Sequence, residues 1–129
     1  IASGDVAATM FWNGYAMRAR AEKPSLEYIY PKEGFTGWMD NVAVPKGAPN
    51  IENAKVFLNF LMDPANAALI SNYARYMGGI KGAEKFMYPE LLDAPEIIIP
   101  AGLPEPEFVP PCDDKVVKLY DRIWTNLLR

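Results

Sequence analysis

The order of three segments at the start of the chain constrains the fold more than any other feature. Val6–Trp12 is a short and nearly continuous apolar run, which is typical of a buried strand in a parallel sheet. Asn13-Gly14 predicts a turn, and Tyr15–Glu22 holds good helix formers. Leu26–Tyr30 alternates weakly and predicts a second strand. Strand, helix and strand in this order predict a βαβ unit with parallel strands and a right-handed crossover.

Two further helices are predicted in the middle of the chain. Apolar residues recur at helical spacing over Ala54–Leu61, and Asn50 is well placed to cap the start of that helix. Asp63 followed by Pro64 is a second start signal, which the apolar positions of Ala67–Ala74 continue. We expect this pair of helices to cover one face of the sheet.

The segments that follow alternate between short elements and loops. Trp38–Val44 is a mixed run that predicts a strand, Lys81–Met87 a short helix, and Glu96–Ile99 a short strand. Ala101–Pro111 carries four prolines, which predicts an ordered linker without regular structure. Together with the first βαβ unit, these elements predict an α/β fold in which a mixed sheet is flanked by helices.

The chain ends in a strongly patterned helix. Apolar side chains form one stripe over Val116–Leu127, and either Asp113 or Asp114 is placed to cap its start. Trp124 lies in the middle of the stripe, so we expect it to be a core residue rather than part of a binding site.

Composition excludes several classes of function. The formal net charge of −3 argues against a nucleic-acid partner, and no apolar run approaches the ~20 residues that span a bilayer. The absence of histidine removes the common nucleophile pairs and His-ligated metal sites, and no glycine-rich phosphate loop occurs. Cys112 is the single cysteine and is followed by two acidic residues, so we expect no catalytic thiol. The sequence predicts neither a metal nor a cofactor.

Four residues offer the chemistry that holds an organic ammonium group: Trp12, Trp38, Asp40 and Tyr76. Aromatic faces attract a cation by roughly 0.5–2 kcal/mol each, and a carboxylate adds charge-assisted hydrogen bonds. Trp12 lies at the carboxyl end of the first predicted strand, and open α/β sheets bind ligands at the carboxyl ends of their strands. The alternatives are ordinary packing for the three aromatic residues and a local turn cap for Asp40.

The order and spacing of three groups of motifs resemble a known family. They are Gly4-Asp5-Val6 through Trp12-Asn13-Gly14, Pro31–Gly34 followed by Trp38–Asn41, and Ala54–Leu61 followed by Asp63-Pro64 and Asn66-Ala67-Ala68. They resemble the C-terminal part of the periplasmic spermidine/putrescine-binding proteins of ABC transporters. The resemblance extends over almost the whole chain and weakens between Pro100 and Asp114.

This resemblance implies a fold, a location and partners. It implies the C-terminal portion of a two-lobed periplasmic binding protein of type II, with residues 1–37 and 80–129 in one lobe and residues 38–79 in the other. The ligand would be a polyamine held in the cleft between the lobes, and the membrane permease of an ABC importer would be the protein partner. Because Ile1 is not an initiator Met and no signal peptide follows it, we expect a preceding N-terminal portion, or a second copy, to complete the fold.

The resemblance also assigns roles to the four residues. Trp12 and Trp38 look like the aromatic walls of the ligand site, Asp40 like its ammonium-binding carboxylate, and Tyr76 like its tyrosine contact. Tyr15 stands where the family commonly has an aspartate, so it is a possible additional contact. The loss of that carboxylate opens the alternative of a smaller amine or an amino acid, such as γ-aminobutyrate or an opine.

Two functions of other classes remain alternatives. A hydrolase that uses paired carboxylates is disfavoured by the absence of histidine and of a second acid near Asp40 in the sequence. An interaction module would bind a protein partner through Ala101–Pro111 and the terminal helix.

Overall fold

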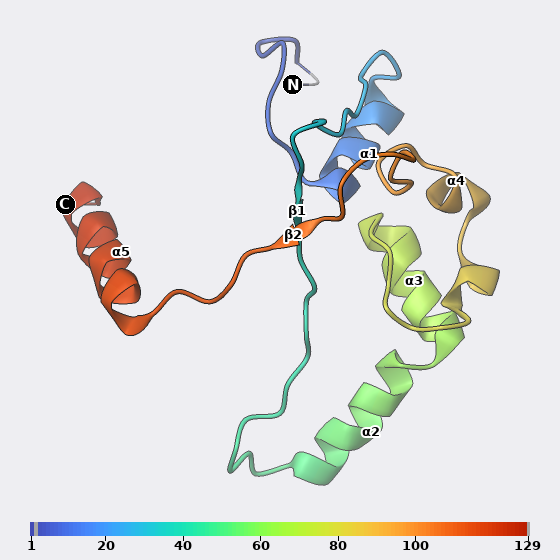
Figure 1. Cartoon of the computed structure of the whole chain (residues 1–129). Coiled ribbons are helices and arrows are strands. Elements are labelled where there is room, and N and C mark those ends of the chain that lie inside the picture. Colours follow the sequence, from blue (N-terminus) through green and yellow to red (C-terminus); the bar gives the residue numbers. More distant parts are fainter. Residues whose placement is uncertain (2, 129) are drawn as a thin grey trace.

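The computed structural model describes Ile1 and residues 3–128, and it is rich in helices (Figure 1). The elements in chain order are α1 (Asn13–Glu22), β1 (Thr36–Gly37), α2 (Ile51–Leu61), α3 (Pro64–Ala74), the 3₁₀ helix η1 (Ala83–Phe86), α4 (Pro89–Leu92), β2 (Glu107–Phe108) and α5 (Asp114–Leu127).

The only sheet within the described residues is a short parallel pair. Thr36 of β1 lies opposite Glu107 of β2, and Gly37 lies opposite Phe108. The N–H of Glu107 also donates to the carbonyl oxygen of Phe35 over 3.0 Å. This pair joins two segments that are far apart in the sequence, near the centre of the molecule (Figure 1).

The four predicted strands are wrong: Val6–Trp12, Leu26–Tyr30, Trp38–Val44 and Glu96–Ile99 contain no strand in the structure. The first three are mostly irregular backbone without a ladder partner, and the fourth is largely a turn. Since a strand exists only through the backbone of a neighbour, an apolar run by itself does not specify one. The predicted βαβ unit and its buried first strand are therefore wrong as well, because the side chains of Val6–Trp12 are exposed.

The helix predictions are confirmed, including most of their start signals. The Asp63 carboxylate accepts hydrogen bonds from the N–H groups of Ala65 and Asn66, and the Asp113 carboxylate accepts one from Val116. Such caps satisfy N–H groups that have no partner within the helix. Asn50 lies at the N-cap of α2, but its side chain makes no capping bond.

The core lies between α1, α3, η1 and α4. Its buried apolar side chains are Met17, Ala67, Ala68, Ala83, Met87, Leu91 and Ala94. Asn72 of α3 joins this region by two hydrogen bonds: its amide nitrogen donates to the Phe86 carbonyl over 3.1 Å, and its amide oxygen accepts from the N–H of Tyr88 over 2.8 Å. Small alanines on α3 let η1 pack closely against it.

A buried ion pair ties α1 to the segment after α4. Nε and Nη2 of Arg20 donate to the two carboxylate oxygens of Glu96 over 2.6 and 2.9 Å, and the side chain of Glu96 is only 1% exposed. This hydrogen bonding raises the pKa of the Arg20 guanidinium. The backbone carbonyl of Glu96 accepts two more bonds, from the Tyr30 hydroxyl over 2.7 Å and from the Asn13 amide over 3.2 Å.

The Tyr30 hydroxyl is expected to make the free energy of unfolding depend on pH in the alkaline range. Burial raises the pKa of Tyr30 to about 12, with further contributions from Tyr28 and Glu96. Because the unfolded chain releases this proton near pH 10, the free energy of unfolding is expected to fall as the pH rises from about 10 to about 12. Urea unfolding at a series of alkaline pH values measures this slope. Tyr30→Phe should reduce the slope, whereas Tyr73→Phe, at a ring that is 88% exposed, should keep it. Equal slopes in the two variants would contradict the role of Tyr30.

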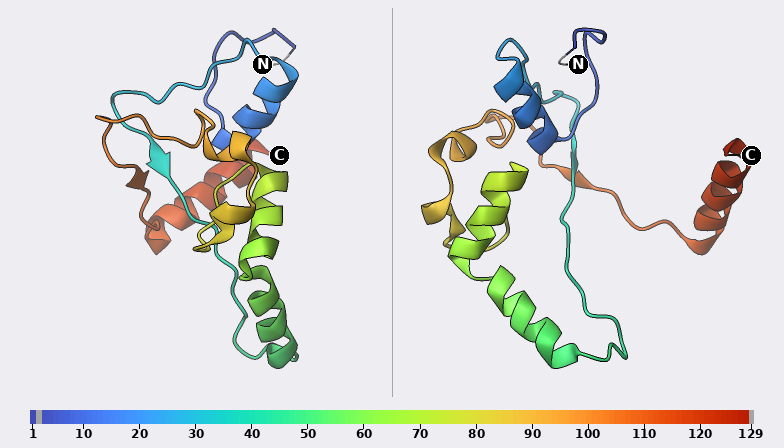
Figure 2. Two further views of the ribbon diagram at one scale, coloured as in Figure 1. Left: turned by 90° about the vertical axis from the view of Figure 1, so that its right-hand side faces the viewer. Right: turned by 180° about the vertical axis from the view of Figure 1, so that it is seen from behind.

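The terminal helix α5 stands apart from the other helices, at the end of an extended segment (Figures 1 and 2). Its described side chains are all exposed, and Trp124 is 58% exposed. The helix and its apolar stripe are confirmed, but the prediction that Trp124 is a core residue is wrong. The stripe shows which side chains seek burial without showing what covers them. Among the described residues, no helix is long and apolar enough to cross a membrane.

Candidate functional site

Three of the four predicted site residues lie together in the structure. The ring centroids of Trp12 and Trp38 are 4.6 Å apart, with the ring planes inclined at 72°. Those of Trp38 and Tyr76 are 5.8 Å apart, at 80°. Both arrangements are edge-to-face, which is a favoured geometry for aromatic pairs. We call these three rings the aromatic cluster, with Trp38 at its centre.

Each ring of the cluster belongs to a residue at or next to the end of a helix or strand. Trp12 is the N-cap residue of α1 and has extended backbone. Trp38 directly follows β1, and Tyr76 follows the C-cap of α3, where Arg75 adopts the left-handed conformation at φ 63°. This conformation ends the helix and redirects the chain, so that the next residue can return over α1.

Gly14 makes room for Tyr76. A Cβ at this position would lie 2.5–2.7 Å from three carbons of the Tyr76 ring, closer than real Cβ contacts allow. A glycine in the first turn of α1 therefore sets how closely Tyr76 approaches the helix. The sequence interpretation missed this role because it took Asn13-Gly14 for a turn. The available signal was a glycine inside a helical pattern, which often has a packing reason.

The Tyr76 hydroxyl lies in a mixed electrostatic environment. Burial raises its pKa, while the charge of Arg18 and a backbone hydrogen bond with Tyr15 oppose that rise, and the charge of Asp40 adds to it. Because Tyr15 lies in the first turn of α1, its N–H has no partner within the helix. The Tyr76 ring thus lies over the first turn of α1 and also belongs to the aromatic cluster.

Asp40 is exposed and lies two residues beyond Trp38. It is close enough to Tyr76 for its charge to act on that hydroxyl. The alternative of a turn cap finds no support within residues 3–128, since the local side-chain bond is made by Asn41, whose amide donates to the Met39 carbonyl over 2.9 Å. Among the described residues, no local hydrogen bond to the Asp40 carboxylate is present.

Tyr15 lies beside the cluster and carries a cation on its ring. The guanidinium carbon of Arg18 is 4.2 Å from the centre of the Tyr15 ring, and Nη1 of Arg18 donates to the Ala74 carbonyl over 2.8 Å. The sequence interpretation did not identify Arg18. The spacing of three residues from Tyr15 was the available signal, because it places both side chains on one face of the helix.

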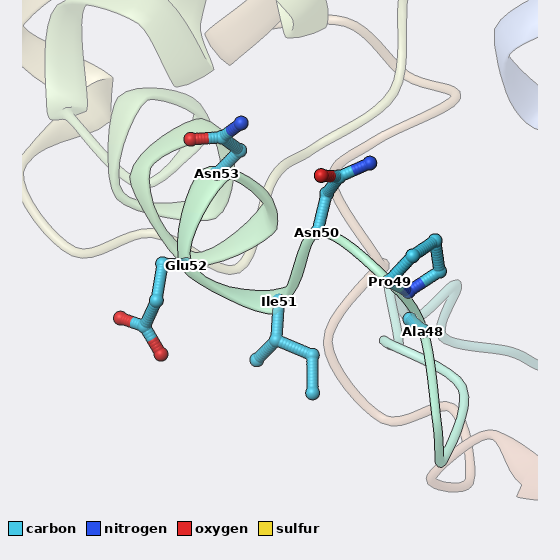
Figure 3. A pocket seen from close by; sticks show the side chains of 6 residues that line it. All are labelled: Ala48, Pro49, Asn50, Ile51, Glu52 and Asn53. Carbon is cyan, nitrogen blue, oxygen red and sulfur yellow. The ribbon is translucent and has the colours of Figure 1, made fainter.

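Two hollows lie outside the aromatic cluster. One is at the start of α2 and is lined by the six consecutive residues Ala48–Asn53 (Figure 3), with Glu52 as its single charged side chain. The other is a groove between α1 and α3, and Arg18, Arg75 and Tyr88 are among the residues that line it. Neither includes a ring of the cluster, so neither is the predicted site. Within the described part of the chain, no group of three or more acidic or cysteine side chains is placed to hold a metal ion.

Comparison with known proteins gives a consistent result. Residues 1–105 match the family described as bacterial extracellular solute-binding protein. The spermidine/putrescine-binding periplasmic protein of Salmonella typhimurium is 39% identical over 68% of this chain and 25% of its own length. The putrescine-binding periplasmic proteins SpuD of Pseudomonas aeruginosa and PotF of Escherichia coli are 29% and 30% identical, each over 98% of this chain and 36% of their own length.

The chain spans about a quarter to just over a third of the length of these curated relatives. No solved structure matches it significantly. The family match extends from the first residue through Trp12, Trp38, Asp40 and Tyr76, and it includes the elements that hold them. The chain belongs to the family of bacterial extracellular solute-binding proteins.

Proposed function

We propose that the chain is part of the periplasmic solute-binding component of an ABC importer and that it binds an organic amine. The aromatic cluster with Asp40 beside it is the observation that carries this proposal. The relatives are named for the polyamines that they bind, which supports it. The site performs no chemistry: it captures the amine and presents it to the membrane permease.

The geometry of the rings suits an ammonium group. Trp12 and Trp38 meet at a steep angle and remain 56% and 40% exposed, so they form a corner with accessible faces. A cation in this corner lies against the negative face of one indole or both. Asp40 supplies the opposite charge and accepts N–H bonds from the ligand.

The binding energies indicate that the aromatic cluster and Asp40 need further protein contacts on the opposite side of the ligand. Each ring contributes about 0.5–2 kcal/mol to holding a cation. Association costs roughly 4–15 kcal/mol of lost freedom, and micromolar affinity requires about −8 kcal/mol net. Three rings and an exposed carboxylate do not reach that value alone. The remaining contacts would come from the rest of a longer protein or from a second copy.

We infer that the whole protein is two-lobed and of the type II periplasmic architecture, with this chain as its C-terminal portion. In the proposed division, residues 1–37 and 80–129 belong to one lobe and residues 38–79 to the other. Trp12 would then come from one lobe, and Trp38 and Tyr76 from the other. The contacts among these rings support the proposal, since a cleft between lobes would bring both sets of side chains onto one ligand.

Asp40→Asn tests the assigned counter-charge. Isothermal calorimetry of the full-length protein with putrescine, spermidine and short monoamines should show about ten- to hundredfold weaker binding of the best ligand, because a charged hydrogen bond contributes about 1.5–3 kcal/mol. Asp121→Asn removes the same charge from an exposed position on α5 and should leave affinity unchanged. Unchanged affinity in Asp40→Asn would remove Asp40 from the site. If the wild-type protein bound none of these amines and no amino acid that carries a terminal ammonium group, the proposed function itself would be wrong.

A further inference from the structure

A fixed cation lies on the ring of Tyr15, in the first turn of α1. Arg18 is partly buried, its guanidinium lies 4.2 Å from the centre of the Tyr15 ring, and its Nη1 donates to the Ala74 carbonyl over 2.8 Å. Ala74 is two residues before Tyr76. The stacking and the hydrogen bond therefore hold a permanent positive charge next to a ring of the proposed site, because an arginine in a protein does not lose its proton.

The fields of two opposite charges meet at Tyr76. The charge of Arg18 lowers the pKa of the Tyr76 hydroxyl, whereas the charge of Asp40 raises it. A ligand that lies on the aromatic cluster thus meets one positive and one negative protein group. A diamine would satisfy Asp40 with one ammonium and bring a second ammonium toward the field of Arg18, where like charges repel each other.

We propose that the ligand is a zwitterion, a short chain with an ammonium group at one end and a carboxylate at the other, whose ammonium lies on the aromatic cluster beside Asp40 and whose carboxylate pairs with Arg18. This inference rests on the proposed function and narrows it to the class of amino acids with separated charges. A guanidinium has five N–H donors in a planar fork that matches a carboxylate. One bond to Ala74 and one stacked face leave donors of that fork for the ligand.

The pairing also explains why Arg18 stacks on Tyr15. Tyr15 is half-exposed and lies on the same face of α1 as Arg18. Stacking on its ring restricts the guanidinium and leaves the edges, which carry the N–H groups, directed away from the ring. An arginine held in this way loses less freedom when it binds a carboxylate.

The test uses calorimetry on the full-length protein with three matched series of increasing chain length: ω-amino acids, alkylamines and terminal diamines. We expect an ω-amino acid to bind at least about tenfold more tightly than the alkylamine and the diamine of the same length. Arg18→Gln should weaken the ω-amino acid by about tenfold or more and leave the alkylamine nearly unchanged. Glutamine retains an N–H donor for the Ala74 carbonyl, and circular dichroism checks the fold.

Two further variants sharpen the result. Arg18→Lys keeps the charge without the fork and should give an intermediate loss. Arg122→Gln removes an exposed arginine from α5 and should have no effect on any series. A diamine that binds more tightly than its matched amino acid, or equal affinities in wild type and Arg18→Gln, overturns the zwitterion and leaves the proposed function standing. Absence of binding in all three series overturns both.

Discussion

Arg20→Met is expected to destabilise the protein by about 3–5 kcal/mol, as breaking one side of a buried ion pair does. The carboxylate of Glu96 is 1% exposed and receives two hydrogen bonds from Arg20. Without the guanidinium, a charge would remain buried with no compensating partner. Urea unfolding followed by circular dichroism at neutral pH measures the loss.

The double variant Arg20→Met with Glu96→Leu is the matched control. It removes both charges and replaces them with apolar groups, so it should recover much of the stability that Arg20→Met loses. The Arg20 side chain is 33% exposed, so water can solvate its guanidinium in the opposite single variant, Glu96→Leu. The loss of stability in Glu96→Leu should therefore be smaller than in Arg20→Met. A loss below about 1 kcal/mol in Arg20→Met would mean that the pair acts like an ordinary surface salt bridge.

Trp38→Ala is expected to reduce the affinity for the proposed amine by about ten- to thirtyfold. Trp38 contacts both other rings of the aromatic cluster, so its removal eliminates a cation–π contact and also frees Trp12 and Tyr76. A cation–π term at the upper end of about 0.5–2 kcal/mol supports a loss of this size. The two ring pairs exist with and without ligand, so their loss lowers the stability of the protein rather than its affinity. Calorimetry on the full-length protein measures it.

Trp124→Ala provides the control for losing an indole. This residue is also exposed but lies on α5, which stands apart from the other helices, and its replacement should leave affinity unchanged. Trp38 is 40% exposed, so Trp38→Ala should retain its helical circular dichroism. Affinity that stays within about twofold of wild type would show that the central ring does not contact the ligand.

Helices could be predicted from the sequence because their signals are local. Asp63 followed by Pro64, and Asp113 before an apolar stripe, specify where a helix begins, and both carboxylates make the expected bonds. Strands could not be predicted in the same way. Val6–Trp12 has the composition of a buried strand, yet it is exposed and unpaired with any strand in the described chain, because pairing depends on a distant backbone.

The site shows the same division between chemistry and packing. Trp12, Trp38 and Tyr76 stood out by side-chain type and by their resemblance to a family, and the structure brings them together. Gly14 and Arg18 gave no comparable signal. The role of Gly14 is the space that it leaves for one ring, and the role of Arg18 depends on the ring that it stacks against. Both roles are therefore defined by three-dimensional contacts at which the sequence pattern only hints.

The parallel pair of β1 and β2 has a consequence for the order of folding. The pairing closes a long loop between Gly37 and Glu107 with a register of only two residues. The entropy lost in closing this loop is therefore large, and few hydrogen bonds compensate for it. The contacts of α3 with η1 join neighbouring elements and form at a much lower entropic cost. Folding should therefore begin around α3 and finish at β1 and β2, and this last pairing should be the first to open in the native state. Since Trp38 directly follows β1, the local opening that is easiest to reach also releases the centre of the aromatic cluster.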